Sequence, residues 1–384
     1  MTIKVVADEA IPFLSSYFSE IAEVELLPGH EISNASLRHA DVLVCRTVTK
    51  VNEALLKNTS IRLVASPTSG LDHIDREYLE TNNISLCSAP GCNANSVAEY
   101  VLSALFVLQQ HQQFSLKDKC VGIVGCGHVG SRLKYLLGVL GIKYRLCDPF
   151  LSSTDFDNFE DMDAIAACDV ISLHVPLTDN GPHATRNLLD ETFLASLRQD
   201  VVIVNTCRGG VVNESALKNI MTANQEVRLI NDVWENEPQV DEQLIGLSSI
   251  ATPHIAGYSL DGKLAATKTV FERVCQHFEV HKADRSDVDI LPQRKALRVS
   301  IDESNNELDT ISLAILASYD VRSDAAAMRR MLEDAVSDRA GYFLDLRNNY
   351  PPRREFSSLE IEIENDSYEL GEKLLRLGFR VSSQ

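Results

Sequence analysis

The amino-acid sequence predicts an α/β protein with two doubly wound parallel-sheet domains and a small C-terminal α+β domain. Short β-branched runs alternate with amphipathic segments as far as His281, which is the pattern of parallel strands joined by helices. The 384 residues exceed what one core of typical size holds, so several domains are expected. Hydrophobic residues make up 45% and charged residues 24%, a balance typical of folded globular proteins.

The first domain is expected to span residues 1–95. Strands are predicted at Ile3–Ala7, Val24–Leu27, Asp41–Arg46 and Leu63–Ser66, with helices near Ile11–Glu20 and Asn52–Asn58. Two long helix candidates, Ser96–His111 and Ser259–His281, can both cross between the first domain and the second. The chain is therefore expected to return to the first domain. Residues of about 263–285 are expected to complete that domain.

The second domain is expected to span residues 96–262 and has the cleaner series of strands. These are predicted at Val121–Gly125, Tyr144–Asp148, Asp169–His174, Val201–Asn205, Leu229–Asp232 and Ile250–Thr252. The series has the number and spacing of strands of a complete nucleotide-binding domain.

The pattern changes after a polar stretch around Lys282–Asp289, and residues 290–384 are expected to form the α+β domain. Its predicted strands are Leu297–Ile301, Leu359–Ile363 and Phe379–Ser382, and its predicted helices are Asp309–Ser318, Asp324–Ser337 and Tyr368–Leu377.

Composition argues against several classes of partner. The net charge of −19 disfavours a nucleic acid. The N-terminus meets Asp8 and Glu9 too early for a signal peptide, and no apolar run reaches the roughly 18 residues that a membrane span needs. Nine cysteines without a Cys-x-x-Cys pair suggest neither disulfides nor a metal site. A cytoplasmic protein without a membrane or metal partner is expected.

A glycine-rich turn follows the first strand of the second domain. Gly125, Gly127 and Gly130 form G-x-G-x-x-G between a strand and a helix that runs to about Gly141. Such glycines let a pyrophosphate approach the free N–H groups of a helix N-terminus. Asp148 ends the next strand, where a carboxylate would accept hydrogen bonds from ribose hydroxyls and repel a 2′-phosphate. NAD is therefore the expected cofactor.

Three charged residues follow later strands of the same domain: Arg208, Glu237 and His254. The ligand crevice of an open α/β sheet lies at the carboxyl ends of its strands. Histidine can accept a hydroxyl proton near neutral pH, a neighbouring carboxylate fixes its tautomer, and arginine grips a carboxylate with two prongs. Each residue alone is more often structural, but together after a dinucleotide fingerprint they predict an active site.

With these motifs the chain resembles the D-2-hydroxyacid dehydrogenase family. The likeness runs from Gly122 to Gly257 and includes His174-Val-Pro-Leu, Asn205-Thr-Cys-Arg-Gly, Asp232-Val-Trp-Glu-Asn-Glu-Pro and Thr252-Pro-His-Ile-Ala-Gly. It implies a Rossmann-type cofactor domain, a flavodoxin-like substrate domain, and NAD-dependent oxidation of a 2-hydroxy acid. Arg208 and Glu237 then become active-site residues and His254 the proton-transfer residue.

Further marks are similar to those of family members that oxidise erythronate 4-phosphate in pyridoxal phosphate synthesis. They are Asp8-Glu9, Ala89-Pro-Gly-Cys-Asn-Ala94, the run from His254 to Lys263, and Tyr350-Pro-Pro-Arg-Arg-Glu-Phe356. The resemblance implies substrate contacts from Thr47, Thr68 and Tyr258. The implied cofactor-binding residues are Gly125, Gly127, His128, Val129, Gly130, Asp148, Val175, Thr206, Cys207, Arg208, Asp232 and Gly257. Thr47 stands where serine is usual, and Val175 where threonine is usual, so a side-chain bond to the cofactor is lost there.

Independently of that likeness, Arg46-Thr47 and Thr68-Ser69-Gly70 follow strands of the first domain. Hydroxyls, backbone N–H groups and an arginine are what a substrate phosphate needs. Ordinary Ser and Thr caps at strand-to-helix turns are the alternative.

Two other functions stay open on the sequence alone. A dehydrogenase of 3-phosphoglycerate or another 2-hydroxy acid shares the core, and an NAD-sensing corepressor can keep Arg208, Glu237 and His254. The C-terminal residues are not needed for the core chemistry, so a homodimer formed through residues 290–384 is expected. Arg353 and Arg354 make a local basic spot that either reaches a phosphate in the partner's cleft or is a solvated pair.

Overall fold

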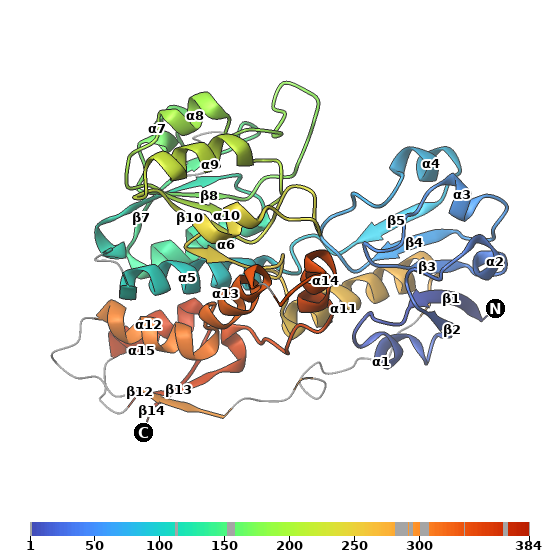
Figure 1. Ribbon diagram of the computed structural model, residues 1–384. Coiled ribbons are helices and arrows are strands. Elements are labelled where there is room, and N and C mark those ends of the chain that lie inside the picture. The colour runs from blue at the N-terminus through green and yellow to red at the C-terminus, as the bar shows by residue number, and fades with distance from the viewer. Residues whose placement is uncertain are drawn as a thin grey trace. The chain divides into compact units, whose positions relative to one another are not determined.

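The computed structural model (Figure 1) describes residues 2–111, 114–151, 158–280, 291, 295–299, 307–333, 335–363 and 368–383. It confirms the predicted fold class, with two parallel-sheet α/β units and a small C-terminal sheet. Contacts divide the chain into Met1–Asn93 with Ser259–Pro292, and Ala94–Tyr258 with Gln293–Gln384. The chain thus returns to the first unit after leaving it, and the C-terminal residues join the second unit.

The first unit has a five-stranded parallel sheet in the order β2-β1-β3-β4-β5. This is the flavodoxin-like order. In such sheets the ligand crevice lies at the carboxyl ends of β1 and β3, where the direction of connection reverses. Its strands are β1 (Ile3–Asp8), β2 (Ala22–Leu27), β3 (Val42–Val44), β4 (Leu63–Ser66) and β5 (Ser85–Ser88). Its helices are α1 (Leu14–Phe18), α2 (Asn34–Leu37), α3 (Glu53–Leu56), α4 (Arg76–Thr81) and α11 (Leu260–His277).

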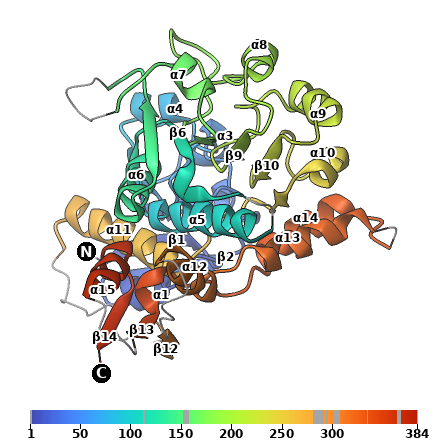
Figure 2. The ribbon, with the colours of Figure 1, turned by 90° about the vertical axis from the view of Figure 1, so that its left-hand side faces the viewer.

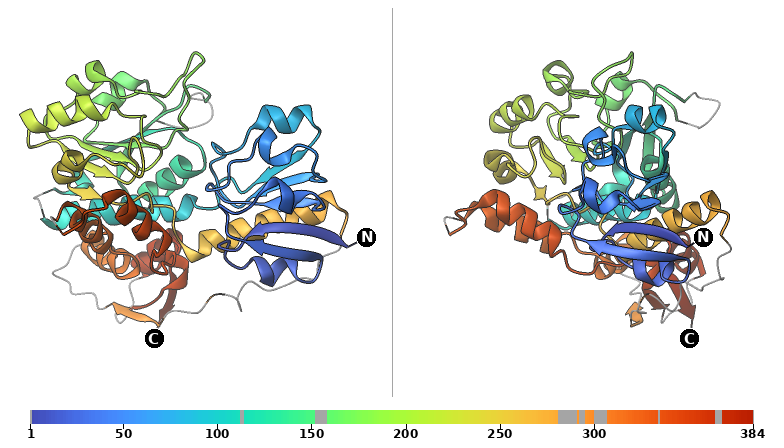
Figure 3. Two further views of the ribbon diagram at one scale, coloured as in Figure 1. Left: turned by 45° about the vertical axis from the view of Figure 1, so that its right-hand side comes forward. Right: turned by 90° about the vertical axis from the view of Figure 1, so that its right-hand side faces the viewer.

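Alternating side chains of this sheet enter two separate cores. Val5 and Val42 face a core that includes α1 and α11, whereas Val6 and Leu43 face one that includes α2, α3 and α4. Figure 3 shows α11 running along the sheet of this unit. Both faces are covered, which is the usual condition of a parallel sheet.

Two predicted elements of this unit are shorter in the structure, and some of its elements were not predicted. The helix expected at Ile11–Glu20 shortens to α1, because Phe13 adopts a left-handed φ of 63° and the helix can begin only after it. The strand expected at Asp41–Arg46 shortens to β3, which leaves Arg46 in the following loop. β5 and α4 were not predicted, since Ser-Leu-Cys-Ser lacks β-branched residues.

The second unit has a six-stranded parallel sheet in the order β11-β10-β9-β8-β6-β7. Its strands are β6 (Cys120–Val124), β7 (Lys143–Cys147), β8 (Val170–Leu173), β9 (Val202–Asn205), β10 (Arg228–Asn231) and β11 (Ile250–Ala251). Its helices are α5 (Ala94–His111), α6 (His128–Leu140), α7 (Met162–Ala166), α8 (Glu191–Ala195), α9 (Glu214–Ala223) and α10 (Glu242–Leu247). All six predicted strands are present.

The strands of this sheet also divide between two cores, and Figure 2 shows helices on both sides of it. Val202 and Val204 of β9 face a core with α5 and α6, whereas Val201 and Ile203 face a core with α8, α9 and α10. The direction of connection reverses between β6 and β8, so the ligand crevice is expected beside the carboxyl end of β6.

The C-terminal residues add a three-stranded parallel sheet in the order β12-β13-β14. Its elements are β12 (Leu297–Val299), α12 (Glu307–Ser318), α13 (Arg322–Arg329), α14 (Arg339–Asn348), β13 (Glu360–Ile363), α15 (Tyr368–Leu377) and β14 (Arg380–Ser383). The helix expected to reach His281 is shorter, because α11 ends at His277. The last two residues of the predicted strand Leu297–Ile301, His281 and the predicted polar stretch 282–289 lie outside the described residues.

The helix predicted at Asp324–Ser337 is wrong. α13 ends at Arg329 and passes into a 3₁₀ turn at Arg330–Leu332. A new helix, α14, starts after Asp338, whose carboxylate caps it by accepting a hydrogen bond from Gly341 N at 2.8 Å. The predicted helix is therefore too long at its C-terminal end, and α14 was not predicted.

Candidate active site

Three neighbouring strands of the second unit place Arg208, Glu237 and His254 at one edge of the sheet. Arg208 follows β9, Glu237 lies in the loop after β10, and His254 follows β11, and these strands pair in that order. A Cβ on Gly209 would lie 2.0 Å from the carbonyl oxygen of Trp234, so the loop with Arg208 packs closely against the loop with Glu237. The structure therefore gathers the three predicted catalytic residues.

Glu237 and His254 form a direct pair. Nδ1 of His254 lies 2.8 Å from Oε2 of Glu237, and Trp234 N donates to Oε1 at 3.0 Å. Burial alone would raise the pKa of Glu237, but the hydrogen bond and charge of His254 outweigh it and lower this pKa below its ordinary value. An ionised Glu237 requires Nδ1 to donate, which leaves Nε2 as the nitrogen that can accept a proton.

Asp232 organises the loop that carries His254. Its side chain is 1% exposed and accepts hydrogen bonds from Thr252 Oγ1 at 2.6 Å, Ile255 N at 2.8 Å and Ala256 N at 2.9 Å. Burial, as the largest effect, raises the pKa of Asp232. His254 itself has a φ of 60°, a left-handed conformation that such a loop must hold against strain. Asp232, expected at the cofactor, thus supports the catalytic loop.

The turn with Arg208 is held by Asn205 at the end of β9. The Asn205 side chain accepts from Cys207 N at 3.2 Å and donates to the Arg208 carbonyl at 3.2 Å. Arg208 Nη1 donates to the Cys207 carbonyl at 2.7 Å. Burial raises the pKa of the Cys207 thiol to about 11, so it stays protonated at neutral pH.

The glycine-rich turn after β6 fits a dinucleotide pyrophosphate. Gly125 has a φ of 91°, and a Cβ there would lie 2.5 Å from the His174 carbonyl. A Cβ on Gly130 would lie 1.9 Å from the Gly125 carbonyl, so only glycine permits this approach of helix and strand. Gly127, by contrast, caps α6 with open space beside it. This open cradle at a helix N-terminus is where the phosphates of NAD would lie.

Some of the other predicted cofactor residues lie at that turn, and the rest follow later strands of the same sheet. His128 and Val129 begin α6, and Val175 lies beside Gly125. Asp148 follows β7, and its carboxylate accepts from Cys126 N at 2.9 Å and Phe150 N at 3.0 Å. Thr206 has a buried hydroxyl without a hydrogen-bond partner among the described residues, which a bound cofactor would supply. Gly257 directly follows Ile255 and Ala256, whose backbone N–H groups donate to the Asp232 carboxylate.

In the first unit, Arg46 and Thr47 follow β3, at the carboxyl ends of β1 and β3. Arg46 pairs with fully buried Asp8 through contacts of 2.8 and 3.2 Å, and its side chain is 34% exposed. Thr47 is exposed. Burial, as the larger effect, and the charge of Arg46 lower the pKa of the Lys263 amine on α11. Lys263 therefore lies near Arg46. Lys263 ends a run that marks the family resemblance, but it was not assigned a role from the sequence, because it lies far along the chain from Arg46.

Thr68 follows β4, but its hydroxyl is used within its own loop. It donates to the Gly70 carbonyl at 2.8 Å and lies 2.8 Å from the Ser66 hydroxyl. The hydroxyl thus links the start of this turn to the carbonyl two residues later. The backbone of the turn is thereby fixed.

Tyr258 has a neighbour that sequence reasoning missed. Arg347 of α14 donates from Nη2 to the Tyr258 hydroxyl at 3.2 Å, and its Nη1 lies 3.8 Å from Oε2 of Glu237. The signal was hidden because α14 itself was not predicted.

The two readings of Arg353 and Arg354 as an exposed basic spot are wrong. The residues are 5% and 8% exposed. Arg353 donates to the carbonyls of Ala256 at 3.0 Å and Ser96 at 2.6 Å, and its guanidinium lies 3.6 Å above the ring of Tyr319. Arg353 therefore ties the C-terminal segment to the loop between His254 and Tyr258 from inside the unit.

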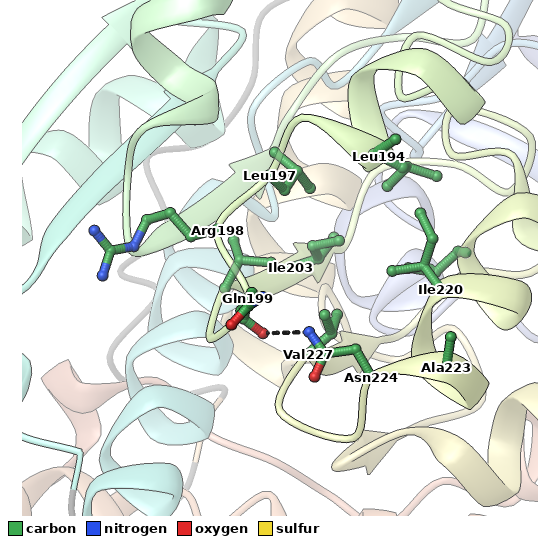
Figure 4. Close-up of a pocket in the computed structure, with 12 residues that line it drawn as sticks. Leu194, Leu197, Arg198, Gln199, Ile203, Ile220, Ala223, Asn224 and Val227 are labelled. Atoms are coloured by element: carbon green, nitrogen blue, oxygen red, sulfur yellow. Dashed lines mark hydrogen bonds between the residues drawn. The ribbon is translucent and has the colours of Figure 1, made fainter.

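A separate apolar pocket lies elsewhere on this unit. It is lined by Leu194 of α8, Arg198 in the loop before β9, Ile203 of β9 and Ile220 of α9, as Figure 4 shows. Arg198 comes before β9, so the pocket lies toward the amino end of that strand and away from the catalytic edge. In the described part of the chain no three His, Cys, Asp or Glu side chains gather as metal ligands, and no helix is long and apolar enough to cross a membrane.

Comparison with known proteins agrees with this geometry. Residues 95–256 match the family described as "D-isomer specific 2-hydroxyacid dehydrogenase, NAD binding domain", and residues 290–378 match a domain of unknown function. A protein of Hahella chejuensis named erythronate-4-phosphate dehydrogenase is 41% identical over 385 residues, covering 100% of both chains. One of the same name from Azotobacter vinelandii is 40% identical, covering 98% of this chain and 99% of its own.

Solved structures share the fold over part of the chain. An NAD⁺-bound 3-phosphoglycerate dehydrogenase of Entamoeba histolytica has a TM-score of 0.62 and 24% identity, covering 74% of this chain and 99% of its own. A D-lactate dehydrogenase of Aquifex aeolicus with NAD and lactic acid has a TM-score of 0.59 and 22% identity, covering 72% and 95%. The chain belongs to the erythronate-4-phosphate dehydrogenases, within the D-isomer specific, NAD-binding 2-hydroxyacid dehydrogenases.

Proposed function

We propose that the protein oxidises erythronate 4-phosphate to 3-hydroxy-2-oxo-4-phosphooxybutanoate in pyridoxal 5′-phosphate synthesis. The observation that carries the proposal is the Glu237–His254 pair, at 2.8 Å, in a chain whose full-length relatives bear that enzyme's name. The pair supplies the general base that oxidation of a secondary alcohol needs.

The residues divide the work of the reaction. Nε2 of His254 accepts the C2 hydroxyl proton, and Glu237 stabilises the imidazolium that results. Arg208 holds the substrate carboxylate through its planar fork. NAD, when bound along the Gly125–Gly130 turn, supplies the acceptor for the hydride that leaves C2. Asp232 keeps the loop fixed, so His254 need not reorganise during proton transfer.

Recognition of the substrate phosphate is assigned to the first unit. Arg46 and Lys263 bring two positive charges to the ends of β1 and β3, and buried Asp8 compensates one of them. Thr47 offers an exposed hydroxyl, and the turn fixed by Thr68 offers backbone N–H groups. Cationic side chains together with hydroxyl and N–H donors are the chemistry that binds a phosphate monoester. Tyr258 of the second unit is a further proposed substrate contact.

NADH formation with erythronate 4-phosphate, measured against 3-phosphoglycerate and D-lactate at equal concentration, tests the assignment. We expect kcat/KM for erythronate 4-phosphate to exceed the others by at least about a hundredfold, because one well-bound phosphate is worth several charge-assisted hydrogen bonds. A preference for 3-phosphoglycerate would reassign the substrate within the family. Binding of NADH without oxidation of any 2-hydroxy acid would favour an NAD-sensing role.

We further propose a cytoplasmic homodimer formed through the C-terminal segment. Leu313, Leu344, Tyr368 and Leu375 of this segment are large apolar side chains with 42–79% of their surface exposed. β12 and β14 are edge strands of the described sheet. A two-fold partner would cover both features. All nine cysteines are free, which is consistent with a reducing compartment.

A further inference from the structure

α14 of the C-terminal segment is fixed so that its last turn meets the catalytic pair. Its start is capped by Asp338, its Phe343 is fully buried in the core of the second unit, and Tyr342 donates to the Ala327 carbonyl at 3.0 Å. Arg347 is four residues after Phe343 and therefore lies on the same side of the helix. Its guanidinium carbon is 5.9 Å from the centre of the Phe343 ring.

The Arg347 side chain is 23% exposed and contacts two residues of the site. Nη2 donates to the Tyr258 hydroxyl at 3.2 Å, and Nη1 lies 3.8 Å from Oε2 of Glu237, the oxygen that accepts from His254. Its guanidinium carbon is 5.9 Å from the centre of the Tyr258 ring. Nε is buried without a partner among the described residues.

Arg347 acts on Glu237 by charge rather than by a hydrogen bond, because 3.8 Å is too long for one. Both oxygens of Glu237 already accept hydrogen bonds, from Trp234 N and from His254 Nδ1. The guanidinium therefore stabilises the carboxylate without taking its hydrogen bond to the histidine.

Several charged groups lie around His254. Glu237 and Asp232 lie on the side of β10. Arg347 lies on the side of α14, and Arg208 is a second cation at the same edge of the sheet. Loss of the Arg347 charge would raise the pKa of Glu237, and a protonated Glu237 could no longer hold Nδ1 of His254 as a hydrogen-bond donor.

We propose that Arg347 is a positioning residue of the active site, which orients the Tyr258 hydroxyl and holds Glu237 ionised, so that Nδ1 of His254 donates to Glu237 and Nε2 is the nitrogen that accepts a proton. The C-terminal segment then contributes to catalysis within its own chain. This inference rests on the proposed function only in taking His254 as the base that oxidises a 2-hydroxy acid.

The test compares Arg347→Met and Arg347→Lys with Arg376→Met, which removes an exposed positive charge from α15 of the same segment. The pH profile of kcat/KM is measured from about pH 5.5 to about pH 9, the range in which histidine titrates. Arg347→Met should move the acid limb upward by about one pH unit, with a loss of about tenfold at the acid end and much less at the alkaline end. Arg347→Lys should return the acid limb of the pH profile most of the way to its wild-type position. Arg376→Met should have the wild-type profile.

Emission of Trp234, the only tryptophan, checks that each variant keeps the fold around Glu237. The ¹⁵N chemical shifts of the His254 ring, assigned with His254→Gln, give a readout without substrate and should show that the Nδ1–H tautomer is less populated in Arg347→Met than in the wild type. An equal loss at every pH, with an unmoved limb and an unchanged tautomer, would overturn the proposal and leave Arg347 a packing residue. A wild type that prefers another 2-hydroxy acid would change the proposed substrate alone.

Discussion

The residues around His254 show how its loop is held in place, which bears on the proton transfer that we propose for this side chain. Nδ1 is engaged by Glu237 at 2.8 Å, whereas the imidazole as a whole stays 31% exposed. The backbone on both sides is fixed by Thr252 and Ile255 through Asp232. Rigid support of this kind is what an acid–base residue requires, since the benefit of proton transfer is lost when the group must first move into place.

His254→Gln should therefore lower kcat by about 10²–10⁴-fold, because the amide can fill the space but cannot accept the proton. NAD binding should change little, since the glycine turn and Asp148 are untouched. Steady-state kinetics and calorimetric titration with NADH measure the two effects. Turnover near that of the wild type would remove His254 from the mechanism.

Asp148→Ala should relax the preference for NAD over NADP. The carboxylate repels a 2′-phosphate and also accepts a hydrogen bond from Cys126 N of the glycine turn. We expect kcat/KM with NADP to rise relative to that with NAD by about tenfold or more. Asp148→Asn is the matched control, since it keeps a hydrogen-bond acceptor and removes only the charge. An unchanged cofactor ratio in both variants would place ribose selection elsewhere.

At the scale of secondary structure, residues next to strong local patterns were predicted and those brought from far along the chain were not. The glycine turn, Arg208 and His254 directly follow buried β-branched strands, and parallel pairing then gathers them without further information. Lys263 and Arg347 reach their positions through packing of α11 and α14. No helix was predicted over Arg339–Asn348, so the contact of the last turn of α14 with the site could not be expected from local patterns.

The start of α9 supports a prediction on the dependence of stability on pH. Glu214 is 8% exposed, and Oε1 accepts from Glu235 N at 2.8 Å, in the loop that leads to Glu237. Burial raises the pKa of Glu214 to about 7 from its ordinary value of 4.5. The folded state thus holds this proton more tightly than the unfolded state, so the stabilisation is complete below about pH 4.5 and is lost as the pH rises through about 7.

Glu214→Gln cannot titrate and keeps an oxygen that can accept from Glu235 N. Its free energy of unfolding relative to the wild type should therefore rise between pH 5 and pH 8, by at most about 3 kcal/mol. Urea unfolding at the two pH values measures the difference. Glu226→Gln, an exposed change on the loop after α9, should show no such trend. A difference that falls with pH would mean that Glu214 is ionised in the folded protein at neutral pH.

For the molecule as a whole, the C-terminal residues are part of the second unit rather than an appendage to it. Phe356 and Phe379 stack with ring centres 4.6 Å apart in the same core as α5 and α6, and Arg353 holds the Ala256 carbonyl. Removal of residues after Lys282 would expose this core, so loss of a dimer in such a truncated chain would not separate assembly from folding. Surface substitutions in the full chain make that separation.

Leu313→Glu combined with Leu375→Glu should convert a wild-type dimer into a monomer. Both side chains are about half exposed, at 54% and 49%, so the substitutions leave the core intact while they place charge in the proposed interface. A stable dimer buries roughly 800 Å² on each partner, and two unpaired charges in such a surface oppose association strongly. Sedimentation velocity measures the mass, and the thermal midpoint checks the fold. Leu26→Glu, at a 43% exposed position on β2 of the first unit, is the matched control and should remain dimeric. A double variant that still sediments as a dimer would place the interface on another surface, and a monomeric wild type would remove the homodimer altogether.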